Sequence, residues 1–135
     1  MTSADVAFRA CGENLPELFS EGAQALVSIM LQNPEAIKPT TSITFNCAAE
    51  SIDMLYFDFL HEFIFYKDSG SLILLPQKLQ IDEPSDGYRL TCHARGEKID
   101  RKRHLFIVDI KAITMHNLGV VKKKNGWSAS VVVDV

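Results

Sequence analysis

The segment from Ile52 to Ile64 limits the possible folds more than any other part of the chain, because it is apolar on most of its surface. Its main face repeats apolar side chains at helical spacing, namely Ile52, Leu55, Tyr56, Phe59, Leu60, Phe63 and Ile64. Met54, Phe57 and Phe65 add apolar surface outside that face. A helix of this kind must be covered by other elements. We therefore expect a central helix, capped by Ser51, in the middle of the core.

A second helix is predicted to begin after Asn14. Asn14 is a favoured N-cap residue, Pro16 falls in the first turn, and Glu17 stands at the capping-box position. Apolar residues then recur at helical spacing as far as Met30. This helix should end near Pro34, because proline cannot continue it.

The remaining segments are predicted to form strands. Strand-like patterns occupy residues 2–10, 41–47, 71–75, 78–81, 88–94, 104–115, 119–123 and 127–133. Pro76 interrupts one of these regions and favours an irregular edge, whereas Asn125-Gly126 predicts a hairpin. Because the late strands follow one another through such turns, we expect an α+β fold. It would be a single two-layer domain, mainly antiparallel sheet packed with two principal helices.

The composition fits one soluble domain. The chain has 135 residues, of which 47% are hydrophobic and 23% charged, enough to bury a core. No apolar run approaches the roughly 18 residues that span a bilayer, so we expect no membrane association. Three cysteines without CxxC spacing argue against a disulfide framework or a cysteine zinc site and favour the cytoplasm. The net charge of −3 gives no general reason to bind nucleic acid.

Two aspartates stand near opposite ends of the chain, each in a short apolar run. Asp5 lies in TSADVAF and Asp134 in SVVVDV. If the two terminal strands pair, these carboxylates meet, and like charges held together cost free energy unless they share a proton or a cation. A hard ion such as Ca²⁺ or Mg²⁺ is the simplest partner for carboxylate oxygens. Two solvated carboxylates at strand ends remain the alternative.

Two basic clusters, at residues 101–103 and 122–124, adjoin expected turns. Solvated turns are the first interpretation, although such charges also steer a protein toward RNA or an acidic surface. Trp127 is the only aromatic residue near the second cluster, which gives little support to an RNA-stacking platform. His104 and His116 could form a proton-transfer pair or act as nitrogen ligands, although a lone histidine in a β-rich domain is more often a satisfied, half-buried structural residue. The motifs GxSxG, HExxH and GxxxxGK[ST] are all absent, so we do not expect an independent enzyme.

Three stretches together resemble the archease family. The opening TSADVAFRACGENLPELFSEGAQAL is similar to the family's strand, glycine and capped helix. The segment GEKIDRKRHLFIVDIKAITMH resembles its second block, and WSASVVVDV resembles its carboxyl end. These stretches occur in the family's order and span nearly the whole chain, so we expect a single archease-like domain over residues 1–135. The family usually has an acidic residue and a histidine where this chain has Met1-Thr2, and a tyrosine where it has Met115.

The resemblance implies a non-enzymatic accessory protein of a GTP-dependent 3′-phosphate RNA ligase. Such a protein promotes guanylylation of the ligase histidine and multiple turnover in tRNA splicing or RNA repair, with only indirect contact to tRNA or RNA. The implied divalent metal ion, Ca²⁺ or else Mg²⁺ or Mn²⁺, is held by Asp5, Asp134 and an oxygen of Val135. Lys111 and His116 are implied in ligase activation. Two alternatives stay open: a small metal-dependent phosphoesterase that uses His116, and a chaperone-like module that binds nonnative protein or RNA.

Overall fold

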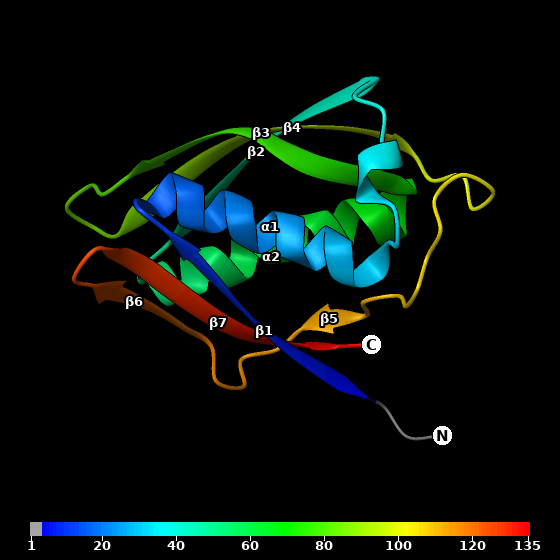
Figure 1. Ribbon diagram of the computed structural model, residues 1–135. Coiled ribbons are helices and arrows are strands. Elements are labelled where there is room, and N and C mark those ends of the chain that lie inside the picture. The colour runs from blue at the N-terminus through cyan, green and yellow to red at the C-terminus, as the bar shows by residue number, and fades with distance from the viewer. Residues whose placement is uncertain (1–3) are drawn as a thin grey trace.

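Two helices lie between two antiparallel sheets in the computed structural model, which describes residues 4–135 (Figure 1). The first sheet has the order β2 (Thr41–Ala49), β4 (Tyr88–Lys98), β3 (Leu72–Asp82). The second contains β1 (Asp5–Gly12), β7 (Gly126–Asp134), β5 (Ala112–Ile113) and β6 (Gly119–Lys123). The helices are α1 (Leu15–Met30), α2 (Ile52–Gly70) and the short 3-10 helix η1 (Pro34–Ala36). The α+β prediction is confirmed.

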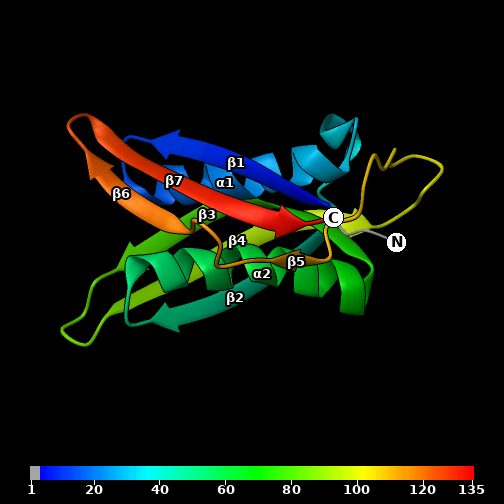
Figure 2. The same ribbon diagram turned by 90° about the horizontal axis from the view of Figure 1, so that it is seen from below.

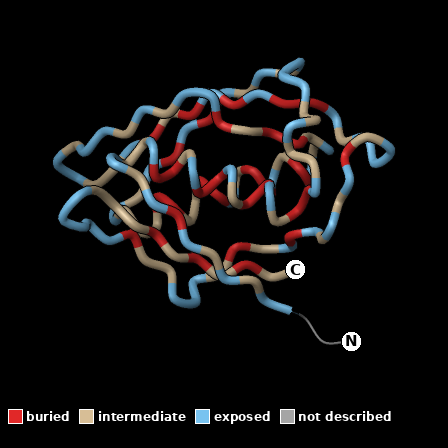
Figure 3. The backbone as a smooth tube through the Cα atoms, viewed as in Figure 1, coloured by how far each residue is buried: buried red, intermediate tan, exposed pale blue. Residues whose placement is uncertain are grey.

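The core fills the space between the sheets, and both helices contribute buried residues to it (Figure 3). Tyr56 and Phe59 of α2 are fully buried. Phe19 of α1 meets both of them, with ring centroids 5.0 and 5.4 Å away. Phe45 of β2 closes the aromatic cluster from the other side, 6.1 Å from Phe59. Such offset and edge contacts add to the stabilisation from burial.

Both long helices are capped by the residues that the sequence predicted. The Asn14 side chain accepts a hydrogen bond from the Glu17 backbone N–H at 2.9 Å, and Ser51 accepts one from Met54 at 3.2 Å. Helix α2 is longer than its apolar pattern indicated and ends at Gly70, followed by Ser71 in the left-handed region (φ 52°). None of the helices within residues 4–135 combines the length and apolar composition that crossing a bilayer requires.

The expected long strand at residues 104–115 is wrong for most of its length. Only Ala112 and Ile113 form a strand there. The preceding part crosses from the first sheet to the second over the end of α1, where the Gln32 N–H donates to Leu105 O (2.8 Å) and the Ile107 N–H donates to Met30 O (2.7 Å). The helix end supplies hydrogen bonds that a sheet neighbour would otherwise supply. The start of the first predicted strand, at residues 2 and 3, lies outside the described residues.

A buried polar cluster fixes the end of β4. Glu97 Oε2 accepts hydrogen bonds from the Lys38 N–H (2.7 Å) and from Nε2 of His104 (3.0 Å), while Arg103 pairs with the other oxygen. The Asp100 N–H donates to Nδ1 of His104, so this ring keeps its proton on Nε2. His104 is fully buried with both nitrogens satisfied, which agrees with its structural interpretation. The hydrogen bond from Arg103, followed by that from Lys38, lowers the pKa of Glu97 to about 2.

Replacing Glu97 by Gln should make the free energy of unfolding less dependent on pH in the acid range. A carboxyl with a lowered native pKa stabilises the fold above its ordinary pKa of 4.5, and the stabilisation is lost as pH falls toward about 2. Urea unfolding should therefore show that the variant is less stable than the parent protein at neutral pH. The difference in their free energies of unfolding should become smaller as pH falls from 4.5 to about 2. The exposed Glu21→Gln change is the matched control. A gap that stays constant from neutral pH to about pH 2 would contradict this assignment.

Candidate functional site

The pairing of β1 with β7 brings Asp5 directly opposite Asp134. The register then runs without interruption to Gly12 opposite Trp127. Opposed residues of an antiparallel pair carry their side chains on the same face of the sheet. The two terminal strands therefore pair, as the sequence hypothesis required, and the carboxylates of Asp5 and Asp134 lie on one face of the sheet. Figure 2 shows β7 between β1 on one side and β6 and β5 on the other.

Asp5 perturbs the ionisation of Asp134. A side-chain hydrogen bond with Asp5, then partial burial and the Asp5 charge, raise the pKa of Asp134. A raised carboxyl pKa means that the folded protein disfavours two full negative charges at this position. The pair consequently attracts a proton or a cation.

Lys111 lies beside the acid pair because β5 follows the opposite edge of β7. The Lys111 N–H donates to the backbone oxygen of Asp134 at 2.8 Å, and Ala112 stands opposite Asp134 in the register. The Lys111 side chain is exposed, and its charge favours the ionised form of Asp134, which opposes the rise in that pKa. The structure thus places a compact positive charge next to two carboxylates.

His116 reaches the same region from the turn between β5 and β6. Thr114 holds this turn: its N–H and Oγ1 both donate to Val132 O, and its Oγ1 accepts from the His116 N–H at 3.2 Å. His116 is exposed, and it too opposes the rise in the pKa of Asp134. Its position next to Met115, which is 60% exposed, leaves the imidazole open to a partner.

Val135 extends the strand pair by one residue. Its N–H donates to Ala4 O at 3.0 Å, which keeps it next to the start of β1. The five residues that the sequence singled out (Asp5, Lys111, His116, Asp134 and Val135) therefore gather at one end of the second sheet. Four separate segments contribute them, and each of these segments either belongs to β7 or is hydrogen-bonded to it.

The donor set suits a hard cation in an open site. Two facing carboxylates offer oxygen ligands of the type that Ca²⁺, Mg²⁺ and Mn²⁺ prefer. Across residues 4–135 no cluster of three or more His, Cys, Asp or Glu side chains is arranged to hold a metal. A structural zinc site, closed by four nitrogen and sulfur ligands, does not fit these residues. Water or a partner's groups would have to complete the coordination shell of any ion held by the pair.

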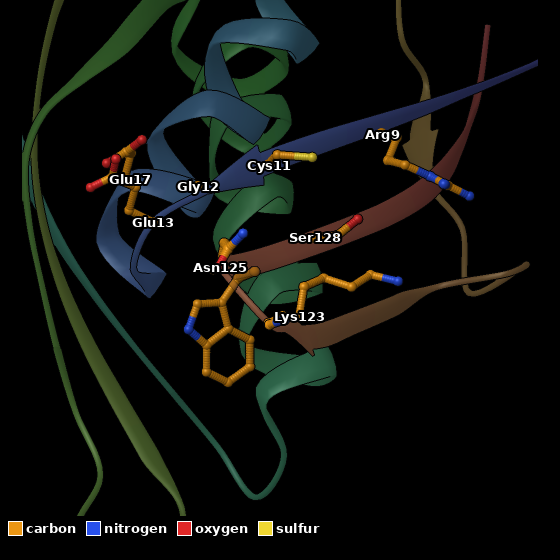
Figure 4. Close-up of a pocket in the computed structure, with 11 residues that line it drawn as sticks. Arg9, Cys11, Gly12, Glu13, Glu17, Lys123, Asn125 and Ser128 are labelled. Carbon is orange, nitrogen blue, oxygen red and sulfur yellow. The ribbon is translucent and has the colours of Figure 1, made fainter.

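A second feature, at the other end of the same strands, was missed by the sequence analysis. A hollow of about 740 Å³ lies beside the β6–β7 turn (Figure 4). Arg9 and Cys11 of β1 line it together with Lys123 and Trp127. The sequence of β1 alternates, and its exposed face carries Asp5, Ala7, Arg9 and Cys11, which could have indicated that Arg9 and Cys11 lie on one surface. Only the register with β7 shows which distant residues join them.

Comparison with known proteins agrees with the resemblance noted in the sequence. The model of the archease protein family (MTH1598/TM1083) matches residues 1–135. The archease of Pyrococcus furiosus is 30% identical over 134 residues, which cover 98% of this chain and 94% of that protein. The archease of Methanosarcina barkeri is 29% identical, with coverage of 98% and 91%.

Solved structures show the same fold. The solution structure of Methanobacterium thermoautotrophicum protein 1598 has a TM-score of 0.84 at 29% identity and covers 100% of this chain and 95% of its own. A Thermotoga maritima crystal structure, described as an archease and possible chaperone, has a TM-score of 0.60 at 20% identity, with coverage of 99% and 93%. At that lower identity the likeness concerns the fold alone.

Removing one of the two facing charges should stabilise the protein in the absence of divalent ions. An acid whose native pKa is raised stabilises the fold only below its ordinary pKa of 3.8, and the benefit is lost as pH rises. Asp134→Asn should therefore raise the melting temperature at neutral pH in a chelator, and the difference should shrink toward about pH 3. Asp86→Asn, in the exposed turn before β4, is the control. A lower melting temperature for Asp134→Asn at neutral pH would contradict the repulsion.

Proposed function

The chain belongs to the archease family, and from this premise we propose that it is an accessory protein of a GTP-dependent 3′-phosphate RNA ligase. The observation that supports this role most directly is the gathering of Asp5, Asp134, Lys111 and His116 at one end of the second sheet. These are the residues that the resemblance implies in metal binding and ligase activation. They come from segments more than a hundred residues apart in the sequence, as Asp5 and Asp134 show.

In this proposal the acid pair holds a divalent cation together with an oxygen of Val135. A bound cation of this kind supplies charge neutralisation for nucleotide phosphates. Lys111 adds an exposed point charge that contacts a phosphate or a carboxylate of the ligase. His116, on its exposed turn, donates to or accepts from the same partner. The pairing of β5 with β7 keeps Lys111 oriented while the ligase histidine becomes guanylylated.

The proposed setting is tRNA splicing or RNA repair in the cytoplasm. The accessory role is promotion of multiple turnover, so the protein is needed in each cycle and performs no ligation itself. In its simplest form the proposal requires contact with RNA only through the ligase.

Chaperone-like binding of nonnative protein is the second candidate, and exposed apolar side chains favour it. Ile107 is 62% exposed and Leu105 is 46% exposed on the crossing segment, and Phe65 is 52% exposed on α2. Exposed apolar groups of this size provide contact surface for unfolded chains. An activity of this type would persist in a chelator and in Asp134→Asn.

Multiple-turnover ligation should depend on the acid pair. With the ligase limiting, and with GTP and a divalent cation present, we expect this protein to increase the number of 3′-phosphate RNA ends joined per ligase. Asp134→Asn should lose most of that stimulation, whereas Asp86→Asn should keep it. Lys111→Met should also lose it, because it removes the charge that contacts the partner. Full stimulation by Asp134→Asn would reject the proposed role for the acid pair.

Metal binding can be measured without any ligase. Addition of Ca²⁺ or Mn²⁺ should raise the melting temperature of the parent protein, since an ion that binds only the folded state stabilises it. Asp134→Asn should show no rise, and Lys111→Met should show one at least as large as the parent. This pair of variants separates loss of metal from loss of a partner contact. Equal thermal shifts in the parent protein and in Asp134→Asn would place the ion elsewhere.

A further inference from the structure

We propose that the ion pair between Lys67 and Asp109 positions Lys111 beside the acid pair. Lys67 lies on the last turn of α2, and Asp109 lies two residues before Lys111 in the segment that crosses between the sheets. We call residues 104–111 the crossing segment. Both Lys67 and Asp109 act through Lys111 and are therefore positioning residues. The consequence for a ligase rests on the proposed function, whereas the position of Lys111 is measurable with this protein alone.

The crossing segment has few backbone attachments. The Ile107 N–H donates to the end of α1, and the Lys111 N–H donates to Asp134 O. Between these two bonds, residues 108–110 make no backbone–backbone hydrogen bond with any described part of the chain. β5 then adds only two residue pairs with β7. Local opening is easiest where backbone bonds are few, so side chains have to hold this stretch.

Two side chains attach this stretch to the body of the molecule. Ile110 is fully buried, and an apolar contact of this kind sets depth without direction. Asp109 Oδ1 lies 2.8 Å from Nζ of Lys67, and this charge-assisted contact does fix a direction. The Lys67 side chain is 3% exposed, whereas that of Asp109 is 50% exposed. The ammonium group on α2 is thus a fixed point, to which the carboxylate is held from the solvent side.

Lys67 has a second carboxylate partner, and this partner does not belong to the crossing segment. Asp68, the next residue of α2, also pairs with Nζ of Lys67. Its side chain is 55% exposed, close to the value for Asp109. Asp68 connects α2 only to itself, whereas Asp109 connects α2 to the crossing segment. Lys67 keeps one carboxylate when either of them is removed, so neither removal leaves a buried unpaired charge.

A hollow of about 320 Å³ adjoins the ion pair. The residues that line it are Lys67, Asp68, Ser71, Ile99, Arg101 and Asp109. A side chain that borders such a space can be replaced by one of similar or slightly larger size without overpacking the core. Variants of Asp109 and Asp68 should therefore fold, and they test attachment rather than packing.

The Lys111 amide reports the attachment directly, because its acceptor is Asp134 O. The Val135 N–H donates to Ala4 O on the other side of Asp134 and provides an internal reference. In Asp109→Asn, we expect hydrogen exchange of the Lys111 amide to become roughly 5- to 10-fold faster, because the loss of one charge-assisted hydrogen bond makes local opening easier. Exchange of the Val135 amide should stay the same. NMR measures both rates residue by residue.

Three matched variants separate attachment from charge. Lys67→Met removes a positive charge instead of a negative one, and it should accelerate exchange of the Lys111 amide as Asp109→Asn does. Asp68→Asn makes the same charge change as Asp109→Asn and should exchange like the parent. Asp109→Glu keeps a carboxylate within reach of Lys67 and should restore slow exchange. The urea midpoints of all these variants should stay near that of the parent, because desolvation of Lys67 offsets much of the attraction.

Ligase stimulation shows whether the position of Lys111 matters in the proposed role. With the ligase limiting, Asp109→Asn should stimulate less than the parent and more than Lys111→Met, whereas Asp68→Asn should match the parent. Asp109→Asn should keep the rise in melting temperature with Ca²⁺, because the β1–β7 register forms the acid pair without the crossing segment. A parent protein without any stimulation would refute the proposed function, and the exchange rates would still decide the position of Lys111.

Three results would overturn the positioning role. One is unchanged exchange of the Lys111 amide in both Lys67→Met and Asp109→Asn. Another is an equal acceleration in Asp68→Asn, which would show a response to charge at the end of α2. The third is parallel acceleration of the Lys111 and Val135 amides together with a lower urea midpoint, which would assign the ion pair to global stability.

Discussion

The position of β7 in the second sheet is the constraint on which the site depends. This strand pairs with β1 from Trp127 to Asp134 and with β5 and β6 along its other edge. Its inward residues, Ala129, Val131 and Val133, are buried against the helices. The alternation of a strand then turns Ser128, Ser130 and Asp134 to the opposite face. Burial of three small apolar side chains thus decides where the polar groups of this sheet are presented.

Buried charges hold the crossing segment that leads into β5. Lys67, nearly fully buried on the last turns of α2, forms an ion pair with Asp109 at 2.8 Å. Glu97 and His104 secure the beginning of the same segment, and Arg101 lies 4.3 Å from the ring centroid of Phe106. The Asp109 carboxylate is half exposed, and such an ion pair is weak evidence for stability, since desolvation of the buried Lys67 offsets much of the attraction. Their effect here is positional, because they fix the path that delivers Lys111 to Asp134.

The features that could be predicted are those that depend only on residues close together in the sequence. The Asn14 and Ser51 caps, the apolar face of α2 and the turn before Gly126 act within a few residues, so they could be predicted from the sequence. The contact between Asp5 and Asp134 was only conditional, because it needed the pairing of two distant strands. The crossing segment was mistaken for a strand because its β-prone residues use a helix end as their hydrogen-bond partner. The hollow that Arg9 and Lys123 both line was missed for a related reason, since only the register of three strands brings its lining residues together.

The strands beside β7 differ in length, and this difference determines which of them separates from β7 more easily. β1 is joined to β7 through eight residue pairs, whereas β5 has two. Local opening follows the number of hydrogen bonds and buried contacts that must be broken. The β5 edge therefore detaches at a lower free-energy cost than the body of the sheet, and it takes Lys111 with it. Within this sheet, the amides that join β7 to β1 become accessible to solvent exchange later than those that join it to β5, so the arrangement around the acid pair can loosen and re-form while the molecule stays folded.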